Sequence, residues 1–324
     1  MAGELAIVMS GGGAKGAFQV GVLDELITTK KVRIDIFCGV STGAIQALGG
    51  AMNDMPGLLA QWLSIKGNGD IYKKRTLGVV EGIFGADSLY DAAPIRAKLK
   101  AYADPAKLKA AKRKLRMGVV SLATGQYQDI DEKNPNVGDW VYASCAQPPF
   151  FQPLVTKDAA GVNEQWVDGG VRNITPLSSA LELKPRATLV ILASPASPVP
   201  APGKIYGNMI DIALRSVGIL TSEVARTDLD NAMLVNDLLA AREAQLRRLL
   251  AAGLPAAAAA DALLPLDTLL ASYSFSPVRL MAPDPGFAAA DTLEFSPAKI
   301  RAAIEAGRKA VNDEWSSLKL FLGV

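Results

Sequence analysis

A pentapeptide, Gly39-Val40-Ser41-Thr42-Gly43, follows the apolar stretch Arg33–Gly39. The pattern G-x-S-x-G is typical of a nucleophile elbow, a sharp turn between a strand and a helix that presents a serine hydroxyl above a sheet. Glycines on both sides of the serine relieve the backbone strain of such a turn. The small residues Ala44 and Ala47 come next and allow a helix to pack closely beneath it. This context predicts a strand, a turn and a helix, with Ser41 as a nucleophile.

The chain contains no histidine. A serine hydroxyl is a weak nucleophile until a base takes its proton, and the familiar histidine base is impossible here. The acceptor must then be Asp, Glu, Lys or Tyr. Asp168 is the best placed carboxylate, because it ends the apolar pair Trp166-Val167 and precedes Gly169-Gly170. An aspartate before two glycines is also a common turn former. A carboxylate matches a serine hydroxyl poorly in pKa, so it must be well aligned and supported by oxyanion donors.

A glycine-rich loop, Gly11-Gly12-Gly13-Ala14-Lys15-Gly16, follows the apolar stretch Leu5–Met9. It matches the G-x-G-x-x-G fingerprint of dinucleotide-binding proteins. That fingerprint also needs an acidic residue at the end of the second strand, which here reads Cys38-Gly39-Val40-Ser41, with Asp35 near its start. No Lys-Ser or Lys-Thr follows the loop, so it is not a P-loop. A third interpretation is an oxyanion hole, made by backbone N–H groups of the three glycines at a helix N-terminus.

The segment Ala143–Pro153 contains three prolines and the aromatic pair Phe150-Phe151. Prolines restrict the backbone, so this segment is expected to form a rigid apolar turn. Such a turn could be the wall of an acyl pocket or ordinary packing between the core and a loop. The sequence does not separate these two interpretations.

Apolar stretches alternate with helical patterns from one end of the chain to the other, which predicts a doubly wound α/β sheet. We expect strands at Leu5–Met9, Arg33–Gly39, Leu115–Ala123, Gln126–Ile130, a stretch ending at Asp168, Ala187–Ala193 and Val278–Ala282. Helices are expected at Gly43–Met52, over much of 57–116 and 207–272, and at Ala298–Leu318 after a cap at Ser296-Pro297. The proline-rich Ser194–Gly203 is expected to be a loop. We expect one domain, residues 1–324, with a helical insertion at roughly 57–116 and an Ala-rich helical segment at roughly 240–272.

The net charge of +2 gives no general attraction to nucleic acid or to a membrane. The two cysteines, Cys38 and Cys145, lie in apolar stretches, which favours reduced thiols in the core over a disulfide. The start, Met1-Ala2-Gly3-Glu4, lacks the basic region of a cleavable signal peptide. The longest uncharged apolar stretch elsewhere, Leu249–Ala260, is too short to span a bilayer. We therefore expect a cytoplasmic protein.

Taken in order, these motifs resemble the patatin-like phospholipase family. The matching elements are the Gly11–Gly16 loop, the Ser41 elbow, the Ala143–Pro153 block and Asp168-Gly169-Gly170, and the segment Asp87-Ser88-Leu89-Tyr90-Asp91 and Gly307 also look like family features. The resemblance spans nearly the whole chain, and residues 240–272 fit it least.

The resemblance implies a three-layer α/β/α fold with a mainly parallel sheet and helical caps. It also implies a Ser–Asp dyad hydrolase that cleaves acyl esters of lipids without calcium or another cofactor. Carried over by position, Ser41 is the nucleophile and Asp168 is the base that also guides the leaving group. Lys15 holds the family's usual basic position, although a solvated lysine in a first helical turn is the interpretation we favour for it. The oxyanion hole would use Gly11, Gly12 and Gly13, and the motifs would be supported by Gly16, Gly39, Gly43, Gly169 and Gly170.

Three other functions stay open at this point: a lipid transacylase with the same dyad, a nucleotide-binding protein that uses the Gly11–Gly16 loop, and a lipid-binding protein with a silent site. A chain without histidine has no imidazole to titrate between about pH 6 and 7. Any pH dependence of activity there must come from a perturbed carboxylate, the amino terminus or the substrate.

A lipid substrate also suggests contact with a membrane surface. From Arg96 to Arg116 the chain has nine Lys and Arg residues and one acidic residue, Asp104. Apolar residues lie just before this run: Ile71, Tyr72, Leu77, Val79, Val80, Ile83 and Phe84. We expect peripheral docking on anionic lipid through the 71–116 region, with a solvated basic helix face as the alternative.

Overall fold

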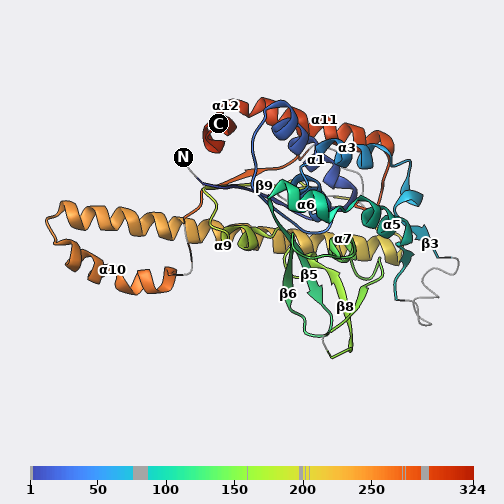
Figure 1. The fold of residues 1–324 in the computed structure, drawn as a ribbon, viewed down its shortest axis with the longest axis horizontal. Coiled ribbons are helices and arrows are strands. Elements are labelled where there is room, and N and C mark those ends of the chain that lie inside the picture. Colours follow the sequence, from blue (N-terminus) through green and yellow to red (C-terminus); the bar gives the residue numbers. More distant parts are fainter. Residues whose placement is uncertain are drawn as a thin grey trace.

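A mixed sheet lies at the centre of the computed structural model (Figure 1). The structure describes residues 3–75, 87–158, 160–196, 200, 202–203, 205–271, 273, 275–285 and 292–324, without the side chains of 210, 214, 221 and 225. Within these ranges the strand order is β10-β9-β1-β2-β5-β8-β7, and β6 pairs with β5. The strands are β1 (Leu5–Met9), β2 (Ile36–Gly39), β5 (Lys114–Ser121), β6 (Tyr127–Asp131), β7 (Leu154–Lys157), β8 (Asn163–Asp168), β9 (Ala187–Ile191) and β10 (Val278–Met281).

The sheet changes direction at β5. The pairs from β10 through β9, β1 and β2 to β5 are parallel, whereas β6, β8 and β7 join antiparallel. The expected doubly wound, mainly parallel sheet is therefore present, with an antiparallel addition at one edge. The strands expected at Leu115–Ala123 and Gln126–Ile130 form as β5 and β6, which pair antiparallel.

Alternate side chains of the central strand β1 point to opposite faces of the sheet, and a layer of helices covers each face. In β1, Leu5, Ile7 and Met9 belong to a large core, while Ala6 and Val8 face a smaller one. The large core is covered by helices that include α1 (Ala17–Asp24), α2 (Thr42–Ala51), α3 (Met55–Leu63), α7 (Val137–Cys145) and α11 (Pro297–Asp313). The smaller core is covered by α8 (Leu177–Leu181) and α9 (Met209–Ala251). This is the expected three-layer α/β/α arrangement.

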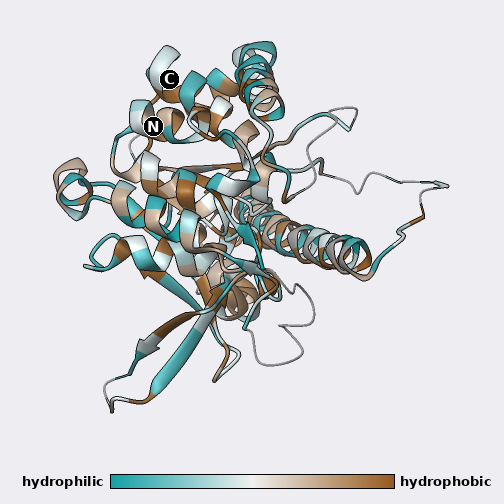
Figure 2. Ribbon diagram, turned by 90° about the vertical axis from the view of Figure 1, so that its right-hand side faces the viewer, coloured by the Kyte–Doolittle hydropathy of each residue, from teal (hydrophilic) through white to brown (hydrophobic). Residues whose placement is uncertain are grey.

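Helix α9 runs along the sheet and continues beyond it, and α10 (Ala256–Leu270) folds back beside its far half (Figure 1). A bidentate ion pair from Arg242 to Asp267 joins the two helices at 2.6 and 2.8 Å. Figure 2 shows apolar and polar residues side by side along α9, and several of its apolar side chains are exposed. The Ala-rich segment is thus helical, as expected.

Several expected boundaries are wrong. The region 57–116 is not wholly helical: besides α3, α5 (Ala93–Tyr102) and α6 (Pro105–Ala111), it contains a short antiparallel pair, β3 (Lys73–Lys74) with β4 (Tyr90–Asp91). The terminal helix is interrupted at Glu314, because the chain turns there so that α12 (Trp315–Leu322) buries Leu318 and Leu322. Ser296 precedes α11 but its side chain makes no capping hydrogen bond. Strand β2 begins at Ile36 rather than Arg33, whose side chain pairs with Asp35 at the surface.

The expected lipid-docking region looks different in three dimensions. Ile71 and Tyr72 are buried in the core, so the expectation that they contact a membrane surface is wrong. Leu77, Val79, Val80, Ile83 and Phe84 lie outside the described residues, as does part of the loop predicted at 194–203. Most cations of the run have partners far away in sequence: Lys107 pairs with Asp54, Lys114 with Glu4, Arg116 with Glu132, and Arg96 and Lys100 with Asp139. Lys109 and Lys112 are exposed and make no ion pair with any described residue.

Across the described ranges, no helix is both long enough and apolar enough to cross a membrane. Cys38 is buried in β2, and Cys145 ends α7, so the two thiols are free, as expected.

Candidate active site

Ser41 occupies a strained turn between β2 and α2. Its φ of 57° and ψ of −129° are unusual for a residue with a side chain. The strand and the helix touch backbone to backbone on either side of it: a Cβ on Gly39 would lie 2.1 Å from the carbonyl oxygen of Gly43, and one on Gly43 would lie 2.2 Å from that of Met9. Only glycine fits at these two positions. The turn has the geometry of the expected nucleophile elbow.

A buried serine holds this turn in place. The Ser41 N–H donates to the Ser144 hydroxyl oxygen at 3.0 Å, and the Ser144 hydroxyl donates to the Gly118 carbonyl at 2.7 Å. These two bonds join α7, the elbow and β5. Sequence reasoning treated Ser144 only as part of the Ala143–Pro153 segment. The available signal was a hydroxyl in an apolar helix, since a buried polar group needs hydrogen-bond partners.

Strand register brings Asp168 to the serine. Gly39, the last residue of β2, pairs with Met117 of β5, and Ser41 follows two residues later in the turn. Val119 of β5, two residues beyond Met117, pairs with Asp168 of the antiparallel β8, and the Ser41 hydroxyl lies close enough to Asp168 to influence the pKa of its carboxyl group. The nucleophile and the carboxylate therefore face each other across β5, although 127 positions separate them in the sequence (168 − 41).

The Asp168 carboxyl group is completely buried. Its Oδ1 accepts the Gly170 N–H at 2.7 Å, whereas its Oδ2 is buried and accepts no regular hydrogen bond from any described residue. Burial raises the pKa of Asp168 to about 7, and the Gly170 N–H and the nearby Ser41 hydroxyl act in the opposite direction. The unused oxygen can take the Ser41 proton once the two side chains tighten, as catalytic pairs do on binding substrate.

The glycine-rich loop lies directly against Ser41. A Cβ on Gly11 would come within 3.0 Å of the Ser41 Cβ. The Gly11 N–H donates to the Ile174 carbonyl at 3.0 Å, and the Ala14 N–H donates to the Thr292 carbonyl at 2.9 Å. The expectation that Gly11 is an oxyanion donor is therefore wrong, because its N–H is already used.

The next two glycines of the loop have free donors. Within the described ranges, the N–H groups of Gly12 and Gly13 have no protein acceptor. Gly13 has a φ of 59°, and a Cβ there would lie 2.0 Å from the Thr292 carbonyl oxygen, so this position also needs glycine. These two N–H groups fit the role of oxyanion donors better than that of Gly11.

Two buried glutamines fix the loop from below. Gln19 of α1 donates through Nε2 to the carbonyls of Ser10 and Ile191 at 2.8 and 2.9 Å. Gln46 of α2 donates to the Gly16 carbonyl at 3.1 Å. Neither glutamine stood out in the sequence, although each is a polar residue inside a helix of otherwise small or apolar residues.

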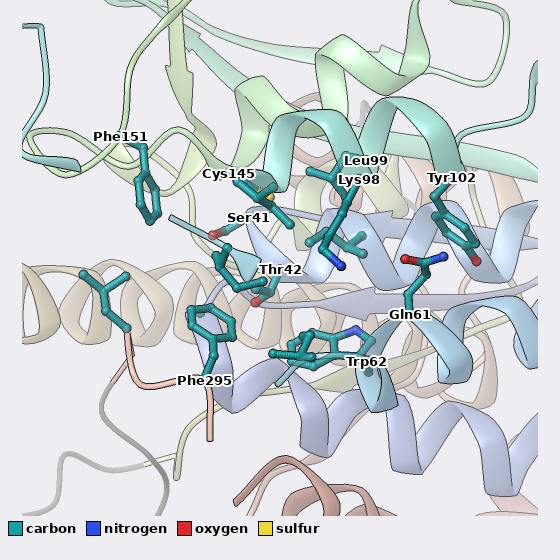
Figure 3. A pocket seen from close by; sticks show the side chains of 16 residues that line it. Ser41, Thr42, Gln61, Trp62, Lys98, Leu99, Tyr102, Cys145, Phe151 and Phe295 are labelled. Atoms are coloured by element: carbon teal, nitrogen blue, oxygen red, sulfur yellow. The ribbon is translucent and has the colours of Figure 1, made fainter. Parts of the chain in front are cut away.

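Two cavities in the described part of the chain have Ser41 in their walls. One, of about 770 Å³, is mostly apolar and extends from Ser41 between α2, α3 and α5 (Figure 3). The other, of about 750 Å³, contains the Gly11–Gly13 loop, Lys15 and three serine or threonine side chains. Phe151 and Cys145 line both, so the Ala143–Pro153 segment forms a wall of the site as well as packing in the core. Burial raises the pKa of the Cys145 thiol well above its usual range, and it stays a neutral thiol.

The described residues contain no cluster of Cys, Asp or Glu side chains that could hold a metal ion.

Comparison with family models supports the sequence resemblance. A family model described as patatin-like phospholipase matches residues 7–181, more than half of the chain. The solved structures that resemble the fold include VipD from Legionella pneumophila, with a TM-score of 0.46 and 14% sequence identity, over 97% of this chain and 67% of that one. A search of curated protein sequences found no match.

The buried carboxylate leads to a prediction about stability. We expect Asp168→Asn to raise the free energy of unfolding at pH 8, with a gain that shrinks as the pH falls toward 5. The folded state binds the Asp168 proton more tightly than the unfolded state, so this group costs stability as pH rises from about 4 to about 7. A pKa displaced from 3.8 to about 7 corresponds to an upper limit of about 4 kcal/mol.

Urea unfolding of both proteins between pH 5 and pH 8 measures this difference. Asp261→Asn, at an exposed position on α10, is the matched control and should show no such trend. A variant that is less stable than the wild type at pH 8 would contradict the prediction.

Proposed function

The chain belongs to the patatin-like phospholipase family, and on this premise we propose that it hydrolyses acyl esters of lipids through a covalent intermediate on Ser41. One observation carries the proposal: the strained Ser41 lies beside a buried carboxylate, Asp168, that has one oxygen without a hydrogen bond. In a chain without histidine, this carboxylate is the group positioned to accept the serine proton.

In the first half-reaction, Asp168 takes the hydroxyl proton while the Ser41 oxygen attacks the ester carbonyl carbon. Negative charge develops on the carbonyl oxygen, and the N–H groups of Gly12 and Gly13 stabilise it. The bond to the leaving alcohol then breaks, and Asp168 returns its proton to that alcohol. The product of this step is an acyl-Ser41 ester.

In the second half-reaction, Asp168 removes a proton from water, which attacks the acyl carbon. The same oxyanion donors act again, and Ser41 regains its proton as the fatty acid leaves. The mechanism needs no metal, because the preformed N–H donors supply the electrostatic stabilisation. A pKa of about 7 leaves Asp168 able both to take and to return a proton near neutral pH.

The two cavities suggest where the parts of a lipid lie. An acyl chain matches the apolar cavity, whose walls include Ile45, Ile65 and Leu99. The alcohol part of the ester matches the second cavity, which holds the glycine loop and Lys15. Ser41 lies where the two meet, as the scissile ester requires.

Other functions receive less support. The position of the Gly11–Gly13 loop against Ser41 favours an oxyanion hole over a separate nucleotide site. A transacylase would share every step up to acyl-Ser41 and differ only in the acceptor. Product analysis with glycerol added to the assay distinguishes transfer to an alcohol from hydrolysis.

We expect a fluorophosphonate probe to label the wild-type protein and not Ser41→Ala. Asp168→Asn should label at least about a hundredfold more slowly, because it cannot accept the hydroxyl proton. Labelling followed on gels and hydrolysis of a 4-nitrophenyl acyl ester measure the two effects. Ser178→Ala, an exposed serine on α8, is the control and should behave as wild type. Activity retained by Ser41→Ala would refute the proposed nucleophile.

We expect kcat/KM for an uncharged ester to rise with pH through an apparent pKa near 7 and then level off. Below this pH the Asp168 carboxyl is protonated and neutral, so it cannot act as base. Initial rates between about pH 5 and pH 9 measure the profile. As a control for denaturation, enzyme kept at each pH is returned to pH 8 and assayed there, where it should recover its full rate. A flat profile, or a limb near the pKa of about 4 typical of an ordinary Asp, would contradict the assignment.

Docking on anionic lipid is the remaining part of the proposal, and it now depends on Lys109 and Lys112, two exposed cations of the basic run that make no ion pair with any described residue. They lie on and just after α6, next in the chain to α5, which borders the apolar cavity. We expect the wild type to float with anionic vesicles. The affinity of the double variant Lys109→Glu, Lys112→Glu for these vesicles should be lower by about tenfold or more.

The control for this flotation assay is Lys133→Glu with Lys157→Glu, an equal charge change at exposed positions on other elements. Equal, negligible flotation of the wild type with anionic and neutral vesicles would rule out docking.

A further inference from the structure

The apolar cavity has a polar far end. Ser41 and Phe151 lie at one end of it, Gln61 and Tyr102 lie at the other, and Lys98 lies between Ser41 and these two (Figure 3). The side chains between the two ends are mainly isoleucine and leucine. An unsubstituted alkyl chain would gain nothing from a cationic group at its methyl end.

Lys98 differs from the other cations of α5. Arg96 and Lys100 both pair with Asp139, at 3.4 and 3.6 Å. Lys98 is partly buried and makes no ion pair or hydrogen bond with any described residue, and none of the described residues that line the cavity is acidic. A partly desolvated ammonium group is stabilised by an anion, and the described residues supply none in this cavity.

Trp62 provides a second, independent donor. Its side chain lines the same cavity and is only 3% exposed, and its Nε1–H is buried without an acceptor. In Figure 3 this nitrogen lies on the edge of the indole turned toward Lys98 and Gln61. A buried donor without an acceptor is costly and rare in native proteins. The Tyr102 hydroxyl, in contrast, already donates to the Asp54 carbonyl at 3.3 Å.

We propose that this cavity selects acyl chains whose far end carries a carboxylate, which Lys98 and Trp62 bind while the ester carbonyl lies at Ser41. The substrates would be monoesters of long dicarboxylic acids, or lipids that carry such an acyl group. This inference rests on the proposed function and names the substrate class of the same site. The reaction itself is unchanged, since the far carboxylate takes no part in bond making.

The cavity fits an acyl group better than an anionic head group. A phosphate in a phospholipid lies only a few bonds from the scissile ester, where the cavity wall is apolar. A dicarboxylic chain instead places methylene groups along that wall and its charge at Lys98. The chain length therefore decides whether the carboxylate reaches the lysine.

The test compares 4-nitrophenyl esters of increasing chain length in three forms: with a far-end carboxylate, with that carboxylate capped as a methyl ester, and with a plain alkyl end. The leaving group is the same throughout, so only the far end of the acyl chain varies. The readout is the ratio of kcat/KM for the carboxylate form to that for the alkyl form at each length.

At the chain length that brings the carboxylate to Lys98, we expect this ratio to fall about tenfold or more in Lys98→Met, because the variant loses a charge-assisted hydrogen bond to the substrate. Lys98→Arg should recover part of it. Trp62→Phe, which removes a neutral donor, should lower the ratio by less. Lys100→Met, which removes a charge from the same helix outside the cavity, should leave the ratio unchanged.

The proposal is overturned if Lys98→Met leaves the ratio unchanged at every length. It is also overturned if the methyl-ester cap is accepted as well as the free carboxylate, because the cavity would then recognise a neutral polar end.

Failure of the proposed function gives a different result, no hydrolysis of any of the esters. A binding measurement then decides the inference. The wild type and Lys98→Met are each titrated by calorimetry with two ligands, the monomethyl ester of a long dicarboxylic acid and the methyl ester of a plain fatty acid. A preference for the former that is lost in Lys98→Met supports the site, and equal binding of both ligands refutes it.

Discussion

The structure depends on one costly feature, a carboxylate without a counterion inside the molecule. Asp168 is fully buried, its pKa is raised to about 7, and one of its oxygens has no hydrogen bond among the described residues. A buried group of this kind lowers stability unless surrounding packing compensates. Strand pairing on both sides of β8 and the Gly170 N–H hold it in place. The same burial that lowers stability raises the pKa of the Asp168 carboxyl, as the base of the proposed dyad requires in a chain that lacks histidine.

Around this carboxylate the site is built largely from backbone. The elbow requires direct contact of strand and helix at Gly39 and Gly43, and the free N–H groups belong to Gly12 and Gly13. Side chains play a supporting part: Ser144 anchors the Ser41 amide, and Gln19 and Gln46 hold the loop by its carbonyls. Backbone donors cannot rotate away, so the proposed oxyanion hole would be preorganised before substrate arrives. This explains why the recognisable motifs of the chain are rich in glycine.

Local patterns predicted the main elements well. The strands at Leu5–Met9 and Val278, the elbow and the long helices appear close to their expected positions, because side-chain periodicity and glycine act within a few residues. Long-range partners were not predictable. The Gly11 N–H is taken by Ile174, the basic run is neutralised by distant acids such as Asp54 and Glu4, and Ile71 is buried. In the sequence, Lys98 was one of nine cations between Arg96 and Arg116, and only the cavity distinguishes it.

The sequence by itself determined the chemistry that is possible. A G-x-S-x-G turn, a glycine loop and the absence of histidine leave an aspartate as the fitting base, and residue types do not depend on the fold. Only the tertiary structure decided that the pair meets, because the pairing of β2 and of the antiparallel β8 with β5 brings Asp168 beside Ser41. It also decided which loop amides stay free among the described residues and which cation lines the apolar cavity. Such relations arise from pairing and burial between residues far apart in the chain, and no local pattern encodes them.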